Sequence, residues 1–264
     1  MSLPQPRPHG TALVTGASSG IGLAFARELS RRGHNTVLVA RREAELRKLA
    51  DELAEFGTHV DVLPCDLADG AARAQLTERL DALDRSVDVA VLCAGFGMRG
   101  SFASADPEQL TAMVRTNVEA TMALAHITVQ GMVARRSGAI LVVASAAGLQ
   151  PVPGFGAYAA TKAAAVAFSE ALSEEVRRYG VTVTALCPGP VRTEFNAVAG
   201  ISDDETPGLL TIDAARCVDE GMKALERGRR VAVPHRGMRL MVRAGRWTPR
   251  RVLLAVSHRA MPGT

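Results

Sequence analysis

The sequence predicts an α/β fold, a doubly wound and mostly parallel sheet of seven strands with helices on both faces, in a single domain. Short β-branched runs alternate with longer amphipathic stretches between residues 11 and 234, which is the order of elements in such a sheet. The short runs are almost continuously apolar, as expected for strands that helices cover on both sides. The length of 264 residues, with 47% apolar and 22% charged residues, suits one globular domain with a sizeable core.

The predicted strands are residues 11–15, 36–40, 58–63, 87–92, 139–144, 181–186 and 230–233. The predicted helices are residues 20–32, 43–56, 69–84, 106–135, 155–179 and 212–227. No linker interrupts residues 11–234, so we expect one dinucleotide-binding catalytic domain there. Residues 1–10 form an N-terminal extension, and residues 235–264 form a basic amphipathic C-terminal extension.

Composition excludes several classes of protein. Residues 137–161 carry no charge, but their glycines and prolines would leave backbone groups unpaired in lipid, so this stretch is not predicted to span a membrane. Residues 1–10 lack the apolar segment of a secretory signal, and we expect a cytoplasmic protein. The four cysteines, at positions 65, 93, 187 and 217, are too far apart for a zinc or redox motif, so we expect buried thiols and no metal.

The first predicted strand leads into a glycine-rich turn that is typical of dinucleotide binding. The turn reads TGASSGIG over residues 15–22 and precedes a predicted helix. Gly16 permits a tight turn, Gly20 lets the backbone approach a pyrophosphate, and Gly22 lets the helix pack closely on the strand. The helix N-terminus would attract the phosphates. The residues expected to contact the cofactor here are Gly16, Ser18, Ser19, Gly20, Ile21 and Gly22.

The ends of the next three strands carry further candidate cofactor contacts. Arg41 directly follows the second strand, where an NAD site would place a carboxylate for the ribose 2′-hydroxyl, whereas a guanidinium suits a 2′-phosphate. We therefore expect NADP (NADPH), with NAD as the alternative, unless Arg41 and Arg42 merely solvate the next helix. Asp66 either accepts a hydrogen bond from the adenine amino group or caps the next helix. The small residues Ala94 and Gly95 would let the backbone lie against the cofactor.

A serine, a tyrosine and a lysine are spaced for proton transfer. Ser145 follows the fifth predicted strand, and Tyr158 and Lys162 lie four residues apart in a predicted helix, on one face and with Cα atoms about 6 Å apart. Tyrosine, with a pKa of about 10, is a poor base at neutral pH, and a nearby ammonium would lower that pKa. Ser145 would donate a hydrogen bond to a substrate oxygen. Asn117 lies inside a long predicted helix, although asparagine is a mediocre helix former. It therefore indicates a functional site, a water-binding position or a simple kink of the helix.

Together these motifs resemble the short-chain dehydrogenase/reductase family, in its compact single-domain branch with a Rossmann-like fold. The resemblance runs from residue 11 to about residue 193 and rests on Thr15-Gly16-x-x-x-Gly20-x-Gly22, Asn117-Val118-x-Ala120, Ser145, Tyr158-x-x-x-Lys162 and Pro188-Gly189-x-x-x-Thr193. One position departs from the family pattern: the usual Asn-Ala-Gly reads Cys93-Ala94-Gly95. We expect this change to affect the sheet more than catalysis.

The resemblance implies roles for individual residues. Tyr158 would be the general acid/base, Lys162 would lower its pKa and hold the nicotinamide ribose, and Ser145 would bind the carbonyl oxygen. Asn117 would belong to a proton relay, and Thr193 would contact the carboxamide of the cofactor. Further cofactor contacts are implied for Tyr158, Lys162, Pro188 and Gly189.

The sequence therefore predicts an NADP-dependent oxidoreductase that interconverts a ketone or aldehyde and an alcohol without a metal. The expected pocket segments, residues 96–98, 146–153 and 191–210, are largely apolar, which favours a lipophilic substrate of steroid or fatty-acyl type. A non-catalytic NADP(H)-sensing binding protein is the alternative, although it would not need the Ser, Tyr and Lys set. We expect a homo-oligomer, a dimer or a tetramer, and no nucleic-acid partner.

The positive charge is concentrated at the C-terminus. Residues 221–264 carry 11 basic residues and one acidic residue, whereas residues 1–220 carry 20 and 26. Arginines recur every three or four positions after residue 235, which predicts a basic amphipathic helical face interrupted at Gly245 and Pro249. We expect this extension to pack on a second subunit or over the substrate mouth; peripheral contact with an anionic membrane is the second choice.

Overall fold

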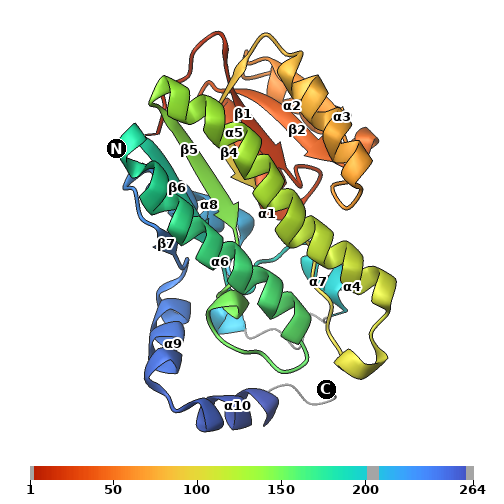
Figure 1. Cartoon of the computed structure of the whole chain (residues 1–264), viewed down its shortest axis with the longest axis vertical. Coiled ribbons are helices and arrows are strands. Elements are labelled where there is room, and N and C mark those ends of the chain that lie inside the picture. Colours follow the sequence, from red (N-terminus) through yellow and green to blue (C-terminus); the bar gives the residue numbers. More distant parts are fainter. Residues whose placement is uncertain (1–2, 201–207, 260–264) are drawn as a thin grey trace.

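The computed structural model describes residues 3–200 and 208–259 and contains a seven-stranded sheet whose neighbouring strands all pair in parallel (Figure 1). The strand order is β3-β2-β1-β4-β5-β6-β7, so the direction of winding reverses between β1 and β4. This confirms the doubly wound α/β fold, with a fully parallel sheet instead of a mostly parallel one. The strands are β1 (Gly10–Thr15), β2 (Asn35–Ala40), β3 (Val60–Pro64), β4 (Ser86–Leu92), β5 (Gly138–Val143), β6 (Val181–Leu186) and β7 (Val231–Ala232).

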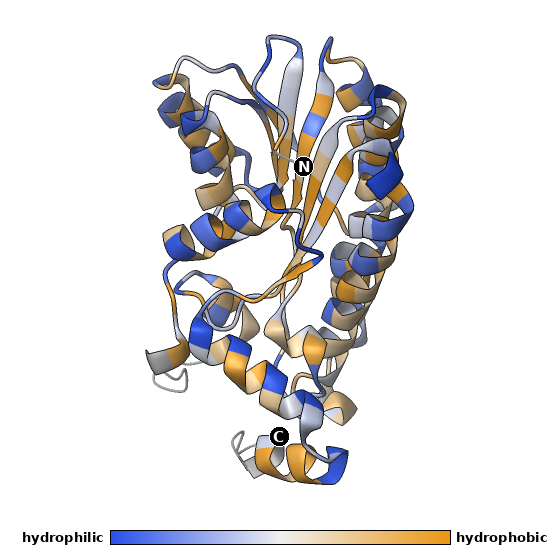
Figure 2. Ribbon diagram, turned by 90° about the vertical axis from the view of Figure 1, so that its left-hand side faces the viewer, coloured by the Kyte–Doolittle hydropathy of each residue, from blue (hydrophilic) through white to orange (hydrophobic). Residues whose placement is uncertain are grey.

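Helices cover both faces of the sheet (Figure 2). One face carries α1 (Gly20–Arg31), α2 (Glu43–Ala54) and α8 (Ala214–Glu226), and the other carries α3 (Gly70–Asp81), α5 (Thr121–Arg135) and α6 (Gly156–Val176). Successive residues of a strand point to opposite faces. In β1, Ala12 and Val14 join the core of the first face and Leu13 joins that of the second. The nearly continuous apolar runs of the sequence arise because each strand supplies two cores.

The helix predicted over residues 106–135 has three parts. α4 (Pro107–Val114) begins it and α5 ends it, but a π-helix, η2 (Arg115–Ala120), lies between them. β7 is shorter than predicted, because it pairs only with Ala185 and Leu186 of β6. The short elements are η1 (Phe102–Ser104), η3 (Ala146–Leu149), η4 (Arg177–Tyr179), α7 (Phe195–Ala199) and η6 (Gly208–Leu210). Within the predicted pocket segment 191–210, residues 201–207 lie outside the described residues.

Both extensions contact the domain. In the N-terminal extension, Arg7 Nε donates a hydrogen bond of 2.7 Å to the buried Asp88 of β4. In the C-terminal extension, α9 (Arg236–Trp247) and α10 (Arg250–Arg259) lie at the end of the molecule toward which β5 points (Figure 1). Across the described ranges, no helix combines the length and the apolar character that crossing a membrane requires.

Candidate active site

The glycine-rich turn joins β1 to α1 in a conformation that requires glycine. Gly16 and Gly20 have φ angles of +67° and +56°, a region that other residues rarely adopt. A Cβ atom on Gly22 would lie 2.7 Å from the carbonyl carbon of Gly16, so glycine lets α1 approach the turn closely. Ser19 is the N-cap of α1 but makes no side-chain cap hydrogen bond. The start of α1 therefore presents N–H groups and a positive dipole end beside the turn, which suits a pyrophosphate.

The carboxyl ends of β1 and β4 are tied together next to this turn. Thr15 Oγ1 accepts hydrogen bonds of 3.0 Å from the backbone N–H groups of both Cys93 and Ala94. A Cβ atom on Gly95 would lie 3.2 Å from Lys162 Nζ, so a side chain at this position would crowd the lysine. Burial raises the pKa of the Cys93 thiol to about 12, which makes it a neutral side chain where the family pattern has asparagine.

Two arginines follow β2, and they are placed differently. Arg41 is exposed and forms no ion pair or side-chain hydrogen bond with a described residue. Arg42 reaches back over the glycine-rich turn, where its Nε donates a hydrogen bond of 3.2 Å to Ser18 Oγ. Its Nη2 lies 3.0 Å from a carboxylate oxygen of Glu194, which precedes α7. The sequence prediction selected Arg41 for the 2′-phosphate, and the structure adds Arg42 as a second guanidinium beside the same turn.

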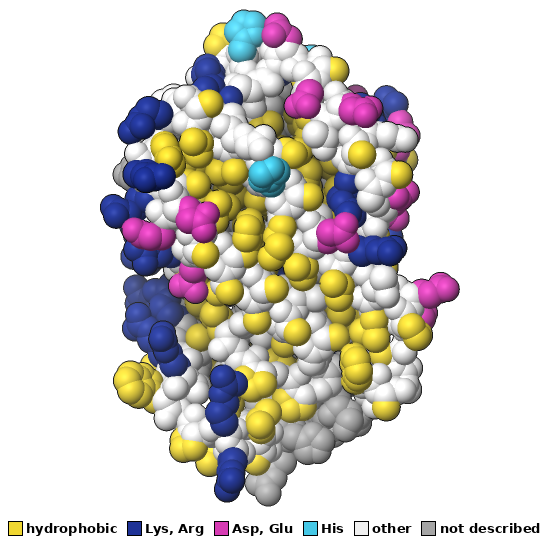
Figure 3. Space-filling view, in the orientation of Figure 1, with side chains coloured by type: hydrophobic (Ala, Val, Ile, Leu, Met, Phe, Trp, Pro, Cys, Tyr) yellow, Lys and Arg dark blue, Asp and Glu magenta, His cyan; other side chains and the backbone are white. Residues whose placement is uncertain are grey.

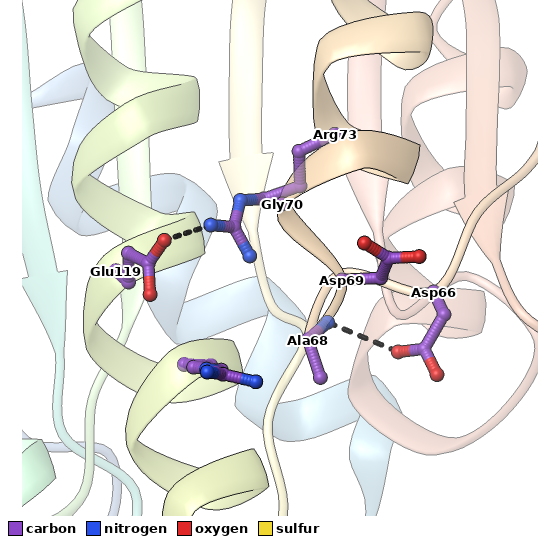
Figure 4. Close-up of a pocket in the computed structure, with 7 residues that line it drawn as sticks. Asp66, Ala68, Asp69, Gly70, Arg73 and Glu119 are labelled. Carbon is purple, nitrogen blue, oxygen red and sulfur yellow. Dashed lines mark hydrogen bonds and ion pairs between the residues drawn. The ribbon is translucent and has the colours of Figure 1, made fainter.

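Asp66 lies just after β3, at the edge of an open cavity of about 570 Å³. Its carboxylate accepts a hydrogen bond of 3.0 Å from the Ala68 N–H group. The N-cap of α3 is Asp69, which accepts a hydrogen bond of 2.8 Å within the first turn, so the suggestion that Asp66 caps this helix was wrong. Figure 4 shows the two aspartates on one side of the cavity and the ion pair of Arg73 with Glu119 on the other. The adenine contact of Asp66 stays a prediction.

Asn117 lies in the π-helix, and its side chain is buried. Its Oδ1 accepts a hydrogen bond of 3.1 Å from the Phe96 N–H group, and its Nδ2 donates one of 2.9 Å to the Phe96 carbonyl oxygen. The same Nδ2 donates a bond of 3.0 Å to Thr161 Oγ1 of α6. The helix irregularity at Asn117 is therefore a π-helix, a feature that is frequent at functional sites. The amide holds the segment after β4 against α6.

Ser145, Tyr158 and Lys162 lie together at the carboxyl end of β5. Ser145 is the N-cap of η3, and its side chain lies close enough to the Tyr158 hydroxyl to act on the pKa of that group. Lys162 Nζ donates a hydrogen bond of 2.8 Å to the Val143 carbonyl oxygen and lies 5.8 Å from the centroid of the Tyr158 ring. Tyr158 is 7% exposed and Lys162 is 5% exposed. The four-residue spacing in α6 thus brings both side chains to one place, as predicted.

Burial controls the protonation of these two groups. It raises the pKa of Tyr158 to about 12, and the nearby Ser145 side chain opposes this rise only in part. It lowers the pKa of Lys162 to about 8. The lowered tyrosine pKa expected from the spacing is therefore not found in the protein alone, because desolvation of the phenolate dominates. A further positive charge beside the ring is needed to bring the pKa of Tyr158 toward neutral.

The turn after β6 faces the glycine-rich turn. A Cβ atom on Gly20 would lie 3.1 Å from the side chain of Thr193, so the two turns are in contact. Thr193 Oγ1 also accepts a hydrogen bond of 3.2 Å from the N–H group of Phe195, the first residue of α7. The Pro188 carbonyl oxygen accepts a hydrogen bond of 2.8 Å from Ala146, which ties this turn to η3. The turn after β6 thus contacts η3 through Pro188 and the glycine-rich turn through Thr193.

An apolar cluster surrounds the Tyr158 ring. The ring centroid lies 6.0 Å from that of Phe155 and 5.6 Å from that of Phe195. Other members of the cluster are Met113, Ala199, Phe96, Met98, Leu110, Ala147, Val152 and Ala157. The sequence prediction placed residues 191–210 at the pocket but did not single out Phe195. Met238 of α9, which packs against Gly189, was not assigned to the site; the sequence predicted only that the extension packs on a second subunit or over the substrate mouth.

These features fit a nicotinamide dinucleotide. Three glycines keep the backbone of the turn open at Gly16, Gly20 and Gly22, the start of α1 faces the turn, and the Arg42 guanidinium stands beside it. The residues that would hold the cofactor extend from this turn to Tyr158, Lys162 and Thr193. Among the side chains that the structure describes, no group of three or more potential metal ligands is found.

Comparison with known proteins assigns the family. The family description "short chain dehydrogenase" matches residues 10–203. Oxidoreductase UcpA of Escherichia coli (strain K12) is 33% identical over 210 residues, which are 79% of this chain and 80% of that protein. A solved short-chain dehydrogenase from Sphingobium yanoikuyae, in complex with NADPH, is 33% identical with a TM-score of 0.81 and covers 90% of this chain and 93% of its own. A bulky-bulky ketone specific alcohol dehydrogenase from Comamonas testosteroni is 30% identical with a TM-score of 0.76, over 89% of this chain and 91% of its own. The chain therefore belongs to the short-chain dehydrogenase family of NAD(P)-dependent oxidoreductases.

Proposed function

We propose that the protein is an NADP-dependent oxidoreductase that interconverts a ketone or aldehyde and an alcohol on a lipophilic substrate. The observation that carries this proposal is the meeting of Ser145 and Tyr158 at the end of β5, with the buried Lys162 5.8 Å from the centroid of the tyrosine ring. A carbonyl oxygen placed between the two hydroxyl groups would accept two hydrogen bonds. The two hydroxyl groups would then polarise the carbonyl group and deliver the proton at the same atom, the carbonyl oxygen.

Each residue has a distinct part in the proposed reaction. The nicotinamide, when bound, gives or accepts the hydride. Tyr158 is protonated at neutral pH because burial raises its pKa, and in the reducing direction it gives this proton to the carbonyl oxygen. Ser145 holds that oxygen, and Lys162 stabilises the phenolate that Tyr158 becomes. Asn117 fixes the Phe96 backbone beside them, and we also assign it the proton relay.

The preference for NADP rests on the residues after β2. Arg41 is exposed at the strand end and has no partner among the described residues, so its guanidinium can bind a 2′-phosphate. The NADPH complex of the Sphingobium relative supports this choice. We assign contacts with the cofactor to Gly16, Ser18, Ser19, Gly20, Ile21, Gly22, Arg41, Asp66, Ala94, Gly95, Tyr158, Lys162, Pro188, Gly189 and Thr193.

The lipophilic substrate is inferred from the walls of the site. Phe155 and Phe195 flank the Tyr158 ring, and the surrounding cluster is apolar. A flat or extended apolar ketone, of steroid or fatty-acyl type, would bury its surface there, whereas a sugar would leave hydroxyl groups unpaired. The relative from Comamonas testosteroni, which is specific for bulky-bulky ketones, supports the same size class.

A non-catalytic NADP(H)-sensing protein is not favoured as the alternative. Such a protein needs the glycine-rich turn but has no use for Ser145 and Tyr158 placed together beside a buried lysine. A homo-oligomer and a cytoplasmic location remain predictions.

The test is NADPH oxidation, read by absorbance, on a panel of cyclic ketones, fatty-acyl ketones and sugars. We expect turnover with apolar ketones and little with sugars. Ser145→Ala should lower kcat by about 10²- to 10³-fold, the usual loss of one oxyanion donor. If the protein binds NADPH but oxidises it with no carbonyl compound in the panel, the enzymatic proposal fails and the sensing alternative is supported.

A further inference from the structure

The C-terminal helices have one face on the domain and another in solvent. On α9, Met238, Val242 and Gly245 recur at helical spacing and form the inner face. Met238 is buried against Gly189, and Gly245 lies beside Gln150, so this face covers η3 and the turn after β6. The extension was expected to pack over the substrate mouth or on a second subunit. Packing over the active-site end of the domain accounts for the inner face of α9 but leaves the outer face without a partner among the described residues.

The outer face exposes large apolar side chains. Trp247 is 88% exposed, Leu240 is 70% exposed and Val256 is 59% exposed. With the exposed Met241, Val252 and Leu254 they make up more than half of the large apolar residues exposed in the described parts of the chain. Such a concentration at one end of a molecule is typical of an interaction surface.

Unpaired arginines surround these apolar side chains. The exposed arginines at positions 236, 243, 246, 250 and 251 form no ion pair or side-chain hydrogen bond with the residues described, and neither helix contains an acidic residue. Among the arginine side chains that the structure describes in these helices, only Arg239, on the inner side, pairs with an acid, Glu220, at 3.2 Å. In the lower left of Figure 3, where Figure 1 places these helices, basic and apolar side chains alternate and no acidic side chain is visible.

We propose that α9 and α10 form a docking surface for a membrane that contains anionic phospholipids. The apolar side chains would enter the boundary between headgroups and acyl chains, and the arginines would pair with lipid phosphates. Tryptophan, here the exposed Trp247 at the last turn of α9, prefers this boundary because its ring is apolar with one polar N–H group.

Other occupants fit the same surface less well. A second copy of the chain whose tail met the same tail across a two-fold axis would bring two arginine-rich faces together without an acidic residue on either helix. A nucleic acid or an acidic protein would be attracted by the arginines, but its contact would leave the exposed Trp247, Leu240 and Val256 unexplained. An anionic bilayer would bind both the exposed arginines and the exposed apolar side chains of α9 and α10.

The proposed surface lies close to the active site. The inner face of α9 covers η3, which begins directly after Ser145. Docking through the outer face would hold the site near the lipid phase in which a lipophilic substrate dissolves. This consequence for substrate supply rests on the proposed function, whereas docking itself does not depend on it.

Trp247 is the only tryptophan in the chain, so its fluorescence reports docking directly. We expect the full-length protein to sediment with vesicles of phosphatidylcholine and phosphatidylserine, with a blue shift of the tryptophan emission. Vesicles of phosphatidylcholine alone should bind at least about tenfold more weakly. Raising the salt concentration from 0.1 M to 1 M shortens the Debye length from about 10 Å to about 3 Å and should release the protein.

A matched pair of double variants separates this surface from overall charge. Arg243→Glu with Arg250→Glu should weaken vesicle binding by about 30-fold or more, because each basic residue at an anionic surface contributes about fivefold. Lys48→Glu with Arg79→Glu makes the same change of net charge on exposed positions of α2 and α3, and should leave binding within about twofold.

Four results would overturn the proposal. The first is no binding of the parent protein to anionic vesicles, and the second is an equal loss in both double variants. The third is an equal emission shift with soluble polyglutamate, which would identify a general polyanion site. The fourth is a tail variant that changes the oligomeric state and leaves vesicle binding intact, which would identify a contact between subunits. None of these results depends on turnover, so they are independent of the proposed enzymatic activity.

Discussion

Lys162 Nζ donates a hydrogen bond of 2.8 Å to the carbonyl oxygen of Val143, the last residue of β5, while lying 5.8 Å from the centroid of the Tyr158 ring. Ser145 follows Val143 by two residues, so this bond fixes α6 relative to the strand end that carries the serine. The lysine therefore positions the Tyr158 and Ser145 pair in addition to supplying charge. This position buries the Lys162 ammonium group, and burial disfavours its charged form.

This burial should make the stability of the cofactor-free protein depend on pH. The pKa of Lys162 falls from 10.5 to about 8, so between these values the unfolded chain binds a proton that the folded protein does not. The free energy of unfolding should therefore rise with pH across this window, relative to Lys162→Met, by about 3 kcal/mol in all. The difference between the two proteins removes the contributions of Tyr158 and the buried thiols. Urea denaturation from pH 7 to pH 10 measures it, and parallel curves for both proteins would contradict the lowered pKa.

Replacement of the proton donor should stop the reaction while leaving the site formed. Tyr158→Phe keeps the ring against Phe155 and Phe195 but removes the hydroxyl, so kcat should fall by about 10²- to 10⁴-fold. The affinity for NADPH should change little, because Lys162 keeps its bond to Val143. Steady-state turnover and a fluorescence titration with NADPH measure the two effects. Turnover close to that of the parent, on any substrate the parent reduces, would show that another group delivers the proton.

Most of the fold could be predicted because it depends on local pattern. The apolar strands identified the parallel sheet, and the spacing of Tyr158 and Lys162 identified one face of α6. The π-helix at Asn117 could not be predicted, because an extra residue in one turn leaves the apolar spacing of the flanking helices almost unchanged. The N-cap of α3 was uncertain because Asp66 and Asp69 are both suited to a cap and lie only three residues apart.

The parts of the site that the sequence did not show depend on tertiary contacts. Arg42 and Glu194 lie 152 positions apart and meet only in the folded protein. Met238 reaches Gly189 from the C-terminal extension. The pKa of Tyr158 could not be predicted from the spacing. The spacing predicts that Lys162 lies near the tyrosine, but the burial of the hydroxyl group depends on the tertiary fold.

The choice of cofactor should depend on Arg41. Arg41→Asp removes a guanidinium that is free to bind the 2′-phosphate and adds a repelling carboxylate, so the affinity for NADPH should fall about tenfold or more. The affinity for NADH should rise relative to NADPH, because the carboxylate suits the ribose 2′-hydroxyl. Arg47→Asp makes the same change of charge at an exposed position of α2 and serves as the control. Fluorescence titration gives both affinities, and an unchanged preference for NADPH in Arg41→Asp would move the 2′-phosphate contact to another residue.

The buried amide of Asn117 should be worth more to stability than an exposed amide in the same helical segment. Asn117→Ala removes the bonds to the Phe96 N–H and carbonyl groups and the bond that the Thr161 hydroxyl accepts, although this hydroxyl still donates to the Tyr158 carbonyl oxygen. Since each such loss costs about 1 kcal/mol or more, the free energy of unfolding should fall by about 3 kcal/mol. Gln130→Ala in α5 removes an exposed amide and should change it by less than about 0.5 kcal/mol. Urea denaturation with an unchanged m-value measures both changes. Equal effects of the two substitutions would mean that the bonds of Asn117 do not hold the segment after β4 in place.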